Sequence, residues 1–180
     1  GDSKPLAELP TLSVVVPVRN EEENVARTLR QLMESDYPRG LLQVIAVDDC
    51  STDRSLAVMK ESQKTYPELI VLGLEKNAGK RHALAAGVGL ATGQIIVFID
   101  SDSFLQPDAL RHLVNRFADP KVAAVTGHCD VENVWTNLLT RMQTVRYYVA
   151  FRVMKAAESV FDSVTCLSGP IAAYRRDVLN

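Results

Sequence analysis

The sequence predicts an α/β domain with a mainly parallel sheet and helices on both faces of that sheet. Short β-branched runs alternate with helical patterns through residues 12–126, and such alternation produces right-handed βαβ units around a parallel sheet. The 180 residues are 47% hydrophobic and 23% charged, which is the balance of a soluble globular protein. The formal net charge of −2 argues against a general nucleic-acid binder, and no apolar run is long enough to span a bilayer.

The first strand is expected at Leu12 to Val18, where the run LSVVVPV is continuous and rich in β-branched residues, as in a strand buried on both faces. Asn20 and Glu23 have the spacing of a capping box and predict the start of the first helix. The inward face of that helix is expected to carry the apolar residues Val25, Leu29, Leu32 and Met33.

The following units repeat this pattern. A second strand is expected at Gln43 to Val47. Ser51 or Thr52 then caps a second helix that reaches about Tyr66. The remaining elements of this half are a third strand at Ile70 to Leu74, a third helix at Lys80 to Ala91, a fourth strand at Gln94 to Ile99, a fourth helix from Pro107 to Phe117, and a fifth strand at Val122 to Thr126.

We divide the chain into an N-terminal extension or leader at residues 1–11, a sheet-forming half at 12–126, and the start of a second half at 127–180. In the second half, apolar residues recur at helical spacing over about 135–160, opposite a face rich in Arg and Lys. This amphipathic helix either packs on the sheet or lies at a membrane surface. A return strand is expected at Val164 to Tyr174, interrupted by Ser168-Gly169-Pro170, and the chain reads as truncated at Asn180.

Polar clusters follow the predicted strands at the end where parallel strands bind ligands. They are Arg19-Asn20-Glu21, Asp48-Asp49, Asn77 to Lys80, and Asp100-Ser101-Asp102. The same residues could instead serve as ordinary caps and turns. The acidic pairs at two neighbouring strand ends favour a binding site.

Asp100 and Asp102 follow a buried strand, and their hard carboxylate oxygens suit Mg²⁺ or Mn²⁺, which bind one or two carboxylates together with substrate phosphates. Asp48 or Asp49 can accept the N–H of a base or sugar hydroxyls, and one of the pair can cap the following helix. Lys80 opens a helix whose N-terminus favours anions such as a pyrophosphate.

Other motifs are excluded. The segment before Gly79-Lys80 lacks the first glycine and the final Ser or Thr of a Walker A loop. Gly87, Gly89 and Gly93 do not lie between a strand and a helix, which argues against a Rossmann dinucleotide site. No nucleophile elbow of a Ser-His-Asp hydrolase occurs.

The segments VVVPVRNEEENV, VDDCSTD, NAGKRHAL and FIDSDS occur in this order and resemble the donor half of a family 2 inverting glycosyltransferase with the GT-A fold. The downstream segments AAVTGHCDVENVWTNLLTRMQTVRYYVAF and CLSGPIAAYRRDVL are similar to hyaluronan synthases.

The resemblance implies that residues 12–126 form the nucleotide-sugar-binding half and that 127–180 begin the acceptor-side half. It implies these roles: Pro17 and Glu21 border the nucleotide, Asp48 and Asp49 hold uridine, Lys80 lies on the nucleotide side, Asp100 and Asp102 bind the metal and the diphosphate, and Ser168, Gly169 and Arg175 lead to the acceptor side.

The substrates implied by the resemblance are UDP-GlcNAc and UDP-GlcA, added to a growing polysaccharide with Mn²⁺ or Mg²⁺ as cofactor. The whole enzyme would lie in the plasma membrane, with this domain on the cytosolic face, and its further partners would be its own transmembrane helices and lipid. The catalytic base and the Q-x-x-R-W segment of the family are expected after Asn180. We therefore expect no catalytic base within this chain, and a soluble fragment that binds UDP and metal without polymerising. The alternatives are a chitin or poly-GlcNAc synthase-type enzyme and a non-catalytic nucleotide-binding module.

Overall fold

The computed structural model describes residues 8–127 and 170–179 of the chain. Within them, six strands form one sheet in the order β3-β2-β1-β4-β6-β5. The strands are β1 (Leu12–Val18), β2 (Leu42–Asp48), β3 (Ile70–Gly73), β4 (Ile95–Ile99), β5 (Ala124–Thr126) and β6 (Ile171–Arg175). Strands β3, β2, β1 and β4 are parallel, whereas β6 runs antiparallel to both of its neighbours, β4 and β5.

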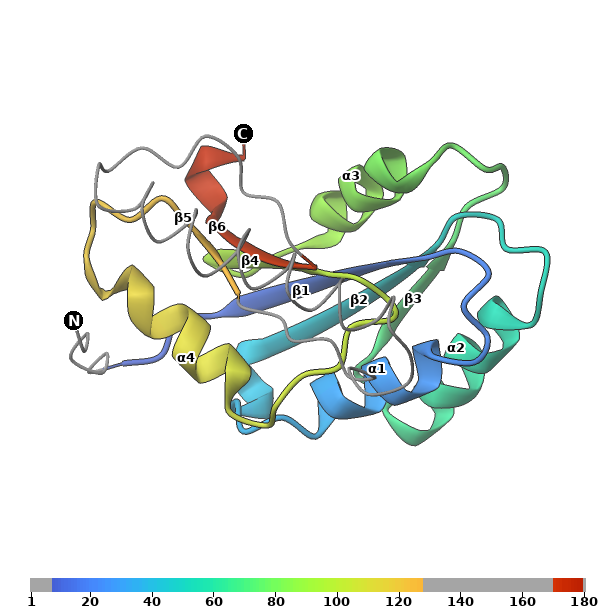
Figure 1. Cartoon of the computed structure of the whole chain (residues 1–180), viewed down its shortest axis with the longest axis horizontal. Helices are drawn as coiled ribbons and strands as arrows, with labels where there is room; N and C mark the ends of the chain where they lie inside the picture. The colour runs from blue at the N-terminus through green and yellow to red at the C-terminus, as the bar shows by residue number, and fades with distance from the viewer. Residues whose placement is uncertain (1–7, 128–169, 180) are drawn as a thin grey trace, which may run out of the picture.

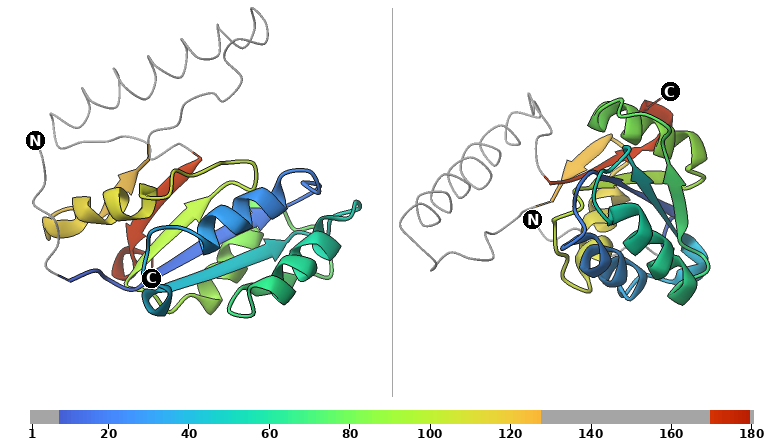
Figure 2. Two further views of the ribbon diagram at one scale, coloured as in Figure 1. Left: turned by 90° about the horizontal axis from the view of Figure 1, so that it is seen from below. Right: turned by 90° about the vertical axis from the view of Figure 1, so that its right-hand side faces the viewer.

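Helices cover both faces of the sheet, as predicted. Helices α1 (Val25–Met33), α2 (Ser55–Thr65) and α4 (Ala109–Asn115) lie side by side on one face, and α3 (Lys80–Leu90) lies on the other (Figures 1 and 2). Short 3₁₀ turns complete the described part: η1 (Arg39–Leu41), η2 (Arg116–Ala118) and η4 (Arg176–Val178). The architecture is therefore an α/β sandwich of helices around a mainly parallel sheet.

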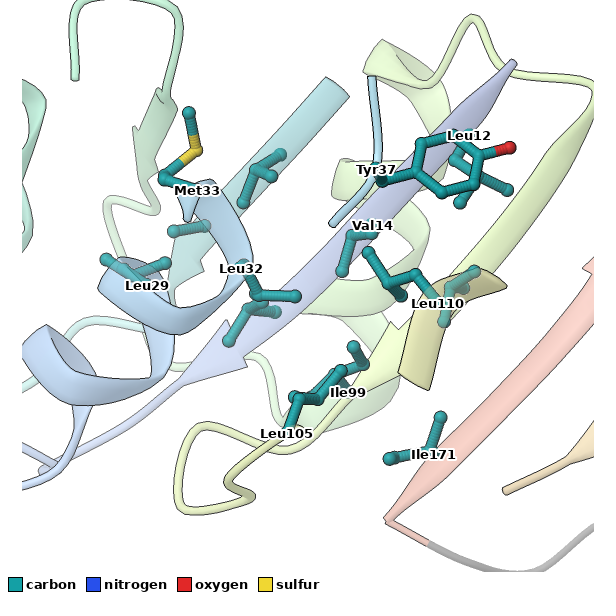
Figure 3. Packing of buried hydrophobic residues seen from close by; sticks show 14 of the residues in the cluster. Leu12, Val14, Leu29, Leu32, Met33, Tyr37, Ile99, Leu105, Leu110 and Ile171 are labelled. Atoms are coloured by element: carbon teal, nitrogen blue, oxygen red, sulfur yellow. The ribbon is translucent and has the colours of Figure 1, made fainter. Parts of the chain in front are cut away.

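The central strand β1 is buried along its whole length because it is apolar on both faces. Val14 packs in the cluster beneath α1 and α4, where Figure 3 shows it between Leu32 and Leu110. Val15 faces α3 instead. Four apolar residues of α1 are buried as the helical spacing predicts: Val25, Leu29, Leu32 and Met33.

Gly87 lets α3 approach the sheet closely. A Cβ atom at this position would lie 2.3 Å from Cγ1 of Val15, so either Val15 or the helix would have to shift. Gly87 is thus a packing residue, in agreement with the exclusion of a dinucleotide fingerprint.

Both predicted helix caps are wrong. Asn20 lies well before α1 in a left-handed conformation, with φ of 52°, and its Oδ1 accepts the N–H of Thr52 at 2.8 Å. The chain instead enters α1 through a turn in which the carbonyl of Glu21 accepts the N–H of Val25. Helix α2 begins at Ser55, and the carboxylate of Asp53 accepts its N–H at 2.9 Å.

The predicted strand ends otherwise agree with the structure to within two residues, and the predicted fourth helix is α4 followed by η2. The amphipathic helix expected at about 135–160 and the first part of the return strand fall among residues 128–169, outside the described residues. The remainder of the return strand is β6, which joins the sheet between β4 and β5.

Candidate functional site

The carboxyl ends of β1, β2 and β4 and the start of α3 surround a pocket of about 390 Å³. Of the seven residues predicted to bind a nucleotide or a metal, six line this pocket: Pro17, Glu21, Asp49, Lys80, Asp100 and Asp102. Arg19 and Asn77, which belong to the predicted polar clusters, also line it. A larger cavity of about 650 Å³ lies beside α4, and none of the seven residues lines it.

The acidic triplet lies directly after β4. The N–H of Asp100 donates to the carbonyl of Pro170 at 3.0 Å, and the carbonyl of Asp100 accepts the N–H of Ser103. The carboxylate of Asp100 pairs with Lys80, with 2.6 Å between Oδ1 and Nζ. The carboxylate of Asp102 is exposed and makes no hydrogen bond or ion pair with another described residue.

Two carboxylates and a lysine at one rim fit a divalent cation together with phosphate groups. Mg²⁺ and Mn²⁺ prefer oxygen ligands and are commonly held by one or two carboxylates plus phosphates. Within residues 8–127 and 170–179, no group of three or more His, Cys, Asp or Glu side chains has metal-binding geometry. The oxygens of Asp100 and Asp102 are suited in chemistry to such a cation, and the ammonium group of Lys80 is suited to phosphate.

Asp49 fixes the start of α3. Its side chain is buried, with 2% exposure of the residue, and its two oxygens accept the N–H groups of Ala78 at 2.8 Å and Gly79 at 2.9 Å. Gly79 has a φ of 88°, a conformation that favours glycine. Because Gly79 precedes Lys80, the carboxylate of Asp49 determines where that lysine enters the pocket.

Asp48 does not line the pocket. Side chains alternate along a strand, so Asp48 points with Ala46 toward the face covered by α1 and α2. Its Oδ2 accepts the N–H of Ser51 at 3.1 Å, and its Oδ1 is buried without a hydrogen-bond partner. The structure thus separates the two carboxylates that the family resemblance implied to hold uridine together.

The loops after β1 and β2 are bonded to each other. The N–H of Asn20 donates to Ser51 Oγ at 3.0 Å, and the N–H of Glu21 donates to Ser55 Oγ at 2.8 Å. Asp53 accepts from Ser55 and from the N–H of Glu22. Desolvation acts to raise the pKa of Asp53, but these hydrogen bonds outweigh it and lower the pKa below its ordinary value. This network holds Glu21 at the rim of the pocket.

Of the three predicted acceptor-side residues, the structure describes Arg175, which does not line the pocket. Arg175 pairs with Ile95 at the opposite end of the sheet, and its guanidinium donates to the carbonyls of Val122, Phe117 and Asp119 at 2.8, 2.8 and 3.1 Å. Arg175 therefore joins β6 to the segment before β5. Ser168 and Gly169 lie outside the described residues.

None of the helices in the described residues combines the length and apolar character that a membrane span requires.

Comparison with known proteins identifies the family. The model of glycosyl transferase family 2 matches residues 13–180. An N-acetylglucosaminyltransferase of Rhizobium meliloti (strain 1021) is 35% identical over 95% of this chain and 40% of its own length. Hyaluronan synthase of Streptococcus pyogenes is 34% identical over 93% of this chain and 41% of its own length. The chain thus spans less than half the length of these relatives.

Solved structures agree with this assignment. The mannosyltransferase PcManGT from Pyrobaculum calidifontis, in complex with GDP-Man and Mn²⁺, has a TM-score of 0.81 and 31% identity over 99% of this chain and 48% of its own. Residues 1–349 of S. aureus TarS, in complex with UDP, have a TM-score of 0.61 and 27% identity over 68% of this chain and 37% of their own. The matched family model and the shared GT-A fold lead to one conclusion: this chain belongs to glycosyl transferase family 2.

Proposed function

We propose that this chain is the donor-binding part of a metal-dependent membrane glycosyltransferase of the hyaluronan synthase type. Its donors would be UDP-GlcNAc and UDP-GlcA, and its product a growing polysaccharide. The similarity to hyaluronan synthase over most of the chain supports this type. The solved complexes of similar proteins with GDP-Man and Mn²⁺ and with UDP support a nucleotide sugar and a metal.

The observation that carries the proposal is the single pocket that contains Asp100, Asp102 and Lys80 beside Asp49. In the proposed complex, Asp100 and Asp102 would hold Mn²⁺ or Mg²⁺, and the cation would supply positive charge to neutralise the diphosphate leaving group. Lys80 lies at the N-terminus of α3, where the helix dipole also favours phosphate.

The uridine would bind on the side of the pocket formed by Pro17, Glu21 and Asp49. The oxygens of Asp49 already accept two backbone N–H groups, but a carboxylate has about four acceptor positions. Its remaining lone pairs can accept the N–H of a base. Asp48 would support the loop and not the nucleotide.

A second candidate is a chitin or poly-GlcNAc synthase-type enzyme. The N-acetylglucosaminyltransferase of Rhizobium meliloti is as similar to this chain as hyaluronan synthase is. The two candidates differ in whether UDP-GlcA is a donor.

In either case we propose that the parent enzyme lies in the plasma membrane with this domain on its cytosolic face, in contact with its own transmembrane helices and lipid. The chain alone would bind donor without forming polymer.

Calorimetric titration with UDP, with and without Mn²⁺, tests the proposal. We expect binding that requires Mn²⁺ and that Asp102→Ala abolishes. Asp108→Ala is the matched control, because Asp108 is an exposed aspartate of the same segment that lies outside the pocket. Titration with UDP-GlcNAc and UDP-GlcA then separates the two enzyme types, since only the hyaluronan type needs both.

Metal-independent binding of UDP would favour a non-catalytic nucleotide-binding module. A wild-type chain that binds no UDP in the presence of Mn²⁺ would refute the proposed function.

A further inference from the structure

Helix α1 contacts the segment that carries the acidic triplet at several points. The hydroxyl of Thr28 donates to the carbonyl of Ser101 at 2.7 Å. One turn later, Oε1 of Gln31 accepts the N–H of Leu105 at 3.2 Å. The guanidinium of Arg27 lies 3.6 Å from the centre of the Phe104 ring. One face of a nine-residue helix thus follows the loop from Ser101 to Leu105.

Thr28 is a polar residue on the buried stripe of α1. It has no exposed surface and lies at helical spacing from Val25 and Leu32, both of which are in the core. Burial of a hydroxyl is unfavourable unless it forms a hydrogen bond. Two acceptors lie within reach, the carbonyl of Ser101 at 2.7 Å and the carbonyl of Asn24 at 3.4 Å. The shorter contact takes the single proton, so the hydroxyl is directed at the loop and not at its own helix.

The carbonyl of Ser101 belongs to the peptide group that leads into Asp102. On the other side of the triplet, the N–H of Asp100 is held by the carbonyl of Pro170. The peptide groups before Asp100 and before Asp102 are therefore each fixed by a partner from another element. The loop then returns to the core at Leu105, which is 7% exposed and packs near Ile99 (Figure 3).

We propose that Thr28 is a positioning residue for the metal-binding carboxylates of Asp100 and Asp102. Its hydroxyl holds the Ser101 carbonyl, and this contact sets the direction in which the flanking carboxylates leave the backbone. The inference rests on the proposed function, since it assumes that these carboxylates bind Mn²⁺ or Mg²⁺. Thr28 itself touches neither metal nor substrate.

The test measures Mn²⁺ affinity by electron paramagnetic resonance, with and without UDP, in three variants. Thr28→Val keeps the shape of the side chain but removes the hydroxyl, and we expect the Kd for Mn²⁺ to rise about 10- to 100-fold, as for other residues that orient metal ligands. Thr28→Ser keeps the hydroxyl and is expected to restore the wild-type Kd. Ser13→Ala is the control, because Ser13 is a fully buried hydroxyl whose partners lie away from the acidic triplet.

A purely structural role predicts a different result. In that case Thr28→Val and Ser13→Ala lower the thermal midpoint alike, and neither changes the Kd for Mn²⁺. Unchanged Mn²⁺ affinity in Thr28→Val, with normal binding in wild type, overturns the inference and leaves the proposed function intact. Wild-type protein that binds no Mn²⁺ with or without UDP overturns both. Should Thr28→Val not fold, Thr28→Ala removes the same hydroxyl, and unchanged Mn²⁺ affinity in that variant overturns the inference as well.

Discussion

Asp49 is expected to contribute to stability as well as to nucleotide binding. Its buried carboxylate accepts two backbone N–H groups from the loop before α3, and Asp49→Asn replaces one of these oxygens with an NH₂ group that faces an N–H donor. A hydrogen bond to a charged group contributes about 1.5–3 kcal/mol. We therefore expect Asp49→Asn to lower the free energy of unfolding by about 1.5–3 kcal/mol. For a chain of this size, that loss lowers Tm by about 3–12 °C.

Asp48→Asn is the matched comparison. Asp48 is adjacent in sequence and equally buried, but one of its oxygens has no partner and the other accepts a single N–H. An amide retains an acceptor for that N–H, so we expect a loss of about 1 kcal/mol or less. Thermal unfolding followed by circular dichroism, without ligand, measures both variants. Equal Tm values for the two variants would refute the assignment of Asp49 as the residue that fixes the start of α3.

Two further predictions concern α3. Gly87→Ala places a Cβ atom against Val15 and is expected to lower the free energy of unfolding by about 1–3 kcal/mol. Gly89→Ala meets no atom within 4 Å and is expected to raise the free energy of unfolding by about 0.5–1 kcal/mol. Denaturant titration measures both variants, and a more stable Gly87→Ala would contradict this packing. Lys80→Met frees Asp100 from an exposed ion pair that contributes about 0.2–1 kcal/mol. We therefore expect the affinity for Mn²⁺ without nucleotide to rise up to about 5-fold and the affinity for UDP to fall. Calorimetry that finds both affinities reduced would argue against competition between Lys80 and the metal.

The sheet and its core were predictable because buried strands and helix faces require apolar residues at characteristic spacings in the sequence. Strand β1 has the bounds predicted from its continuous apolar run, and α1 buries the stripe that its helical spacing predicts. In each case the pattern records which side chains avoid water, and that information is local. The position of β6 between β4 and β5, antiparallel to both, could not be predicted in this way, because the residues of a strand do not indicate which strands it pairs with.

The helix caps were not predictable for a related reason. Asn20 has a side chain suited to capping a helix, but its oxygen binds the N–H of Thr52 in a different loop. Local spacing cannot distinguish a residue that caps its own helix from one that bonds a distant loop, because both need the same acceptor. The same limit applies to Arg175, whose guanidinium binds three carbonyls of the chain and is indistinguishable in sequence from a ligand-binding arginine.

The separation of Asp48 from Asp49 was half predictable. Adjacent residues at a strand end point to opposite faces, so only one member of the pair could enter a pocket on a given side. The sequence does not say which one, because β2 is apolar toward both faces and its pattern does not mark the side on which α3 packs. The structure supplies that side: Ile45 and Val47 face α3, and Asp49 follows their direction to the loop that carries Lys80. Asp49 is thus the carboxylate of the pair that lines the pocket, and under the proposed function it is the one that would meet the nucleotide, while Asp48 holds the loop through the N–H of Ser51.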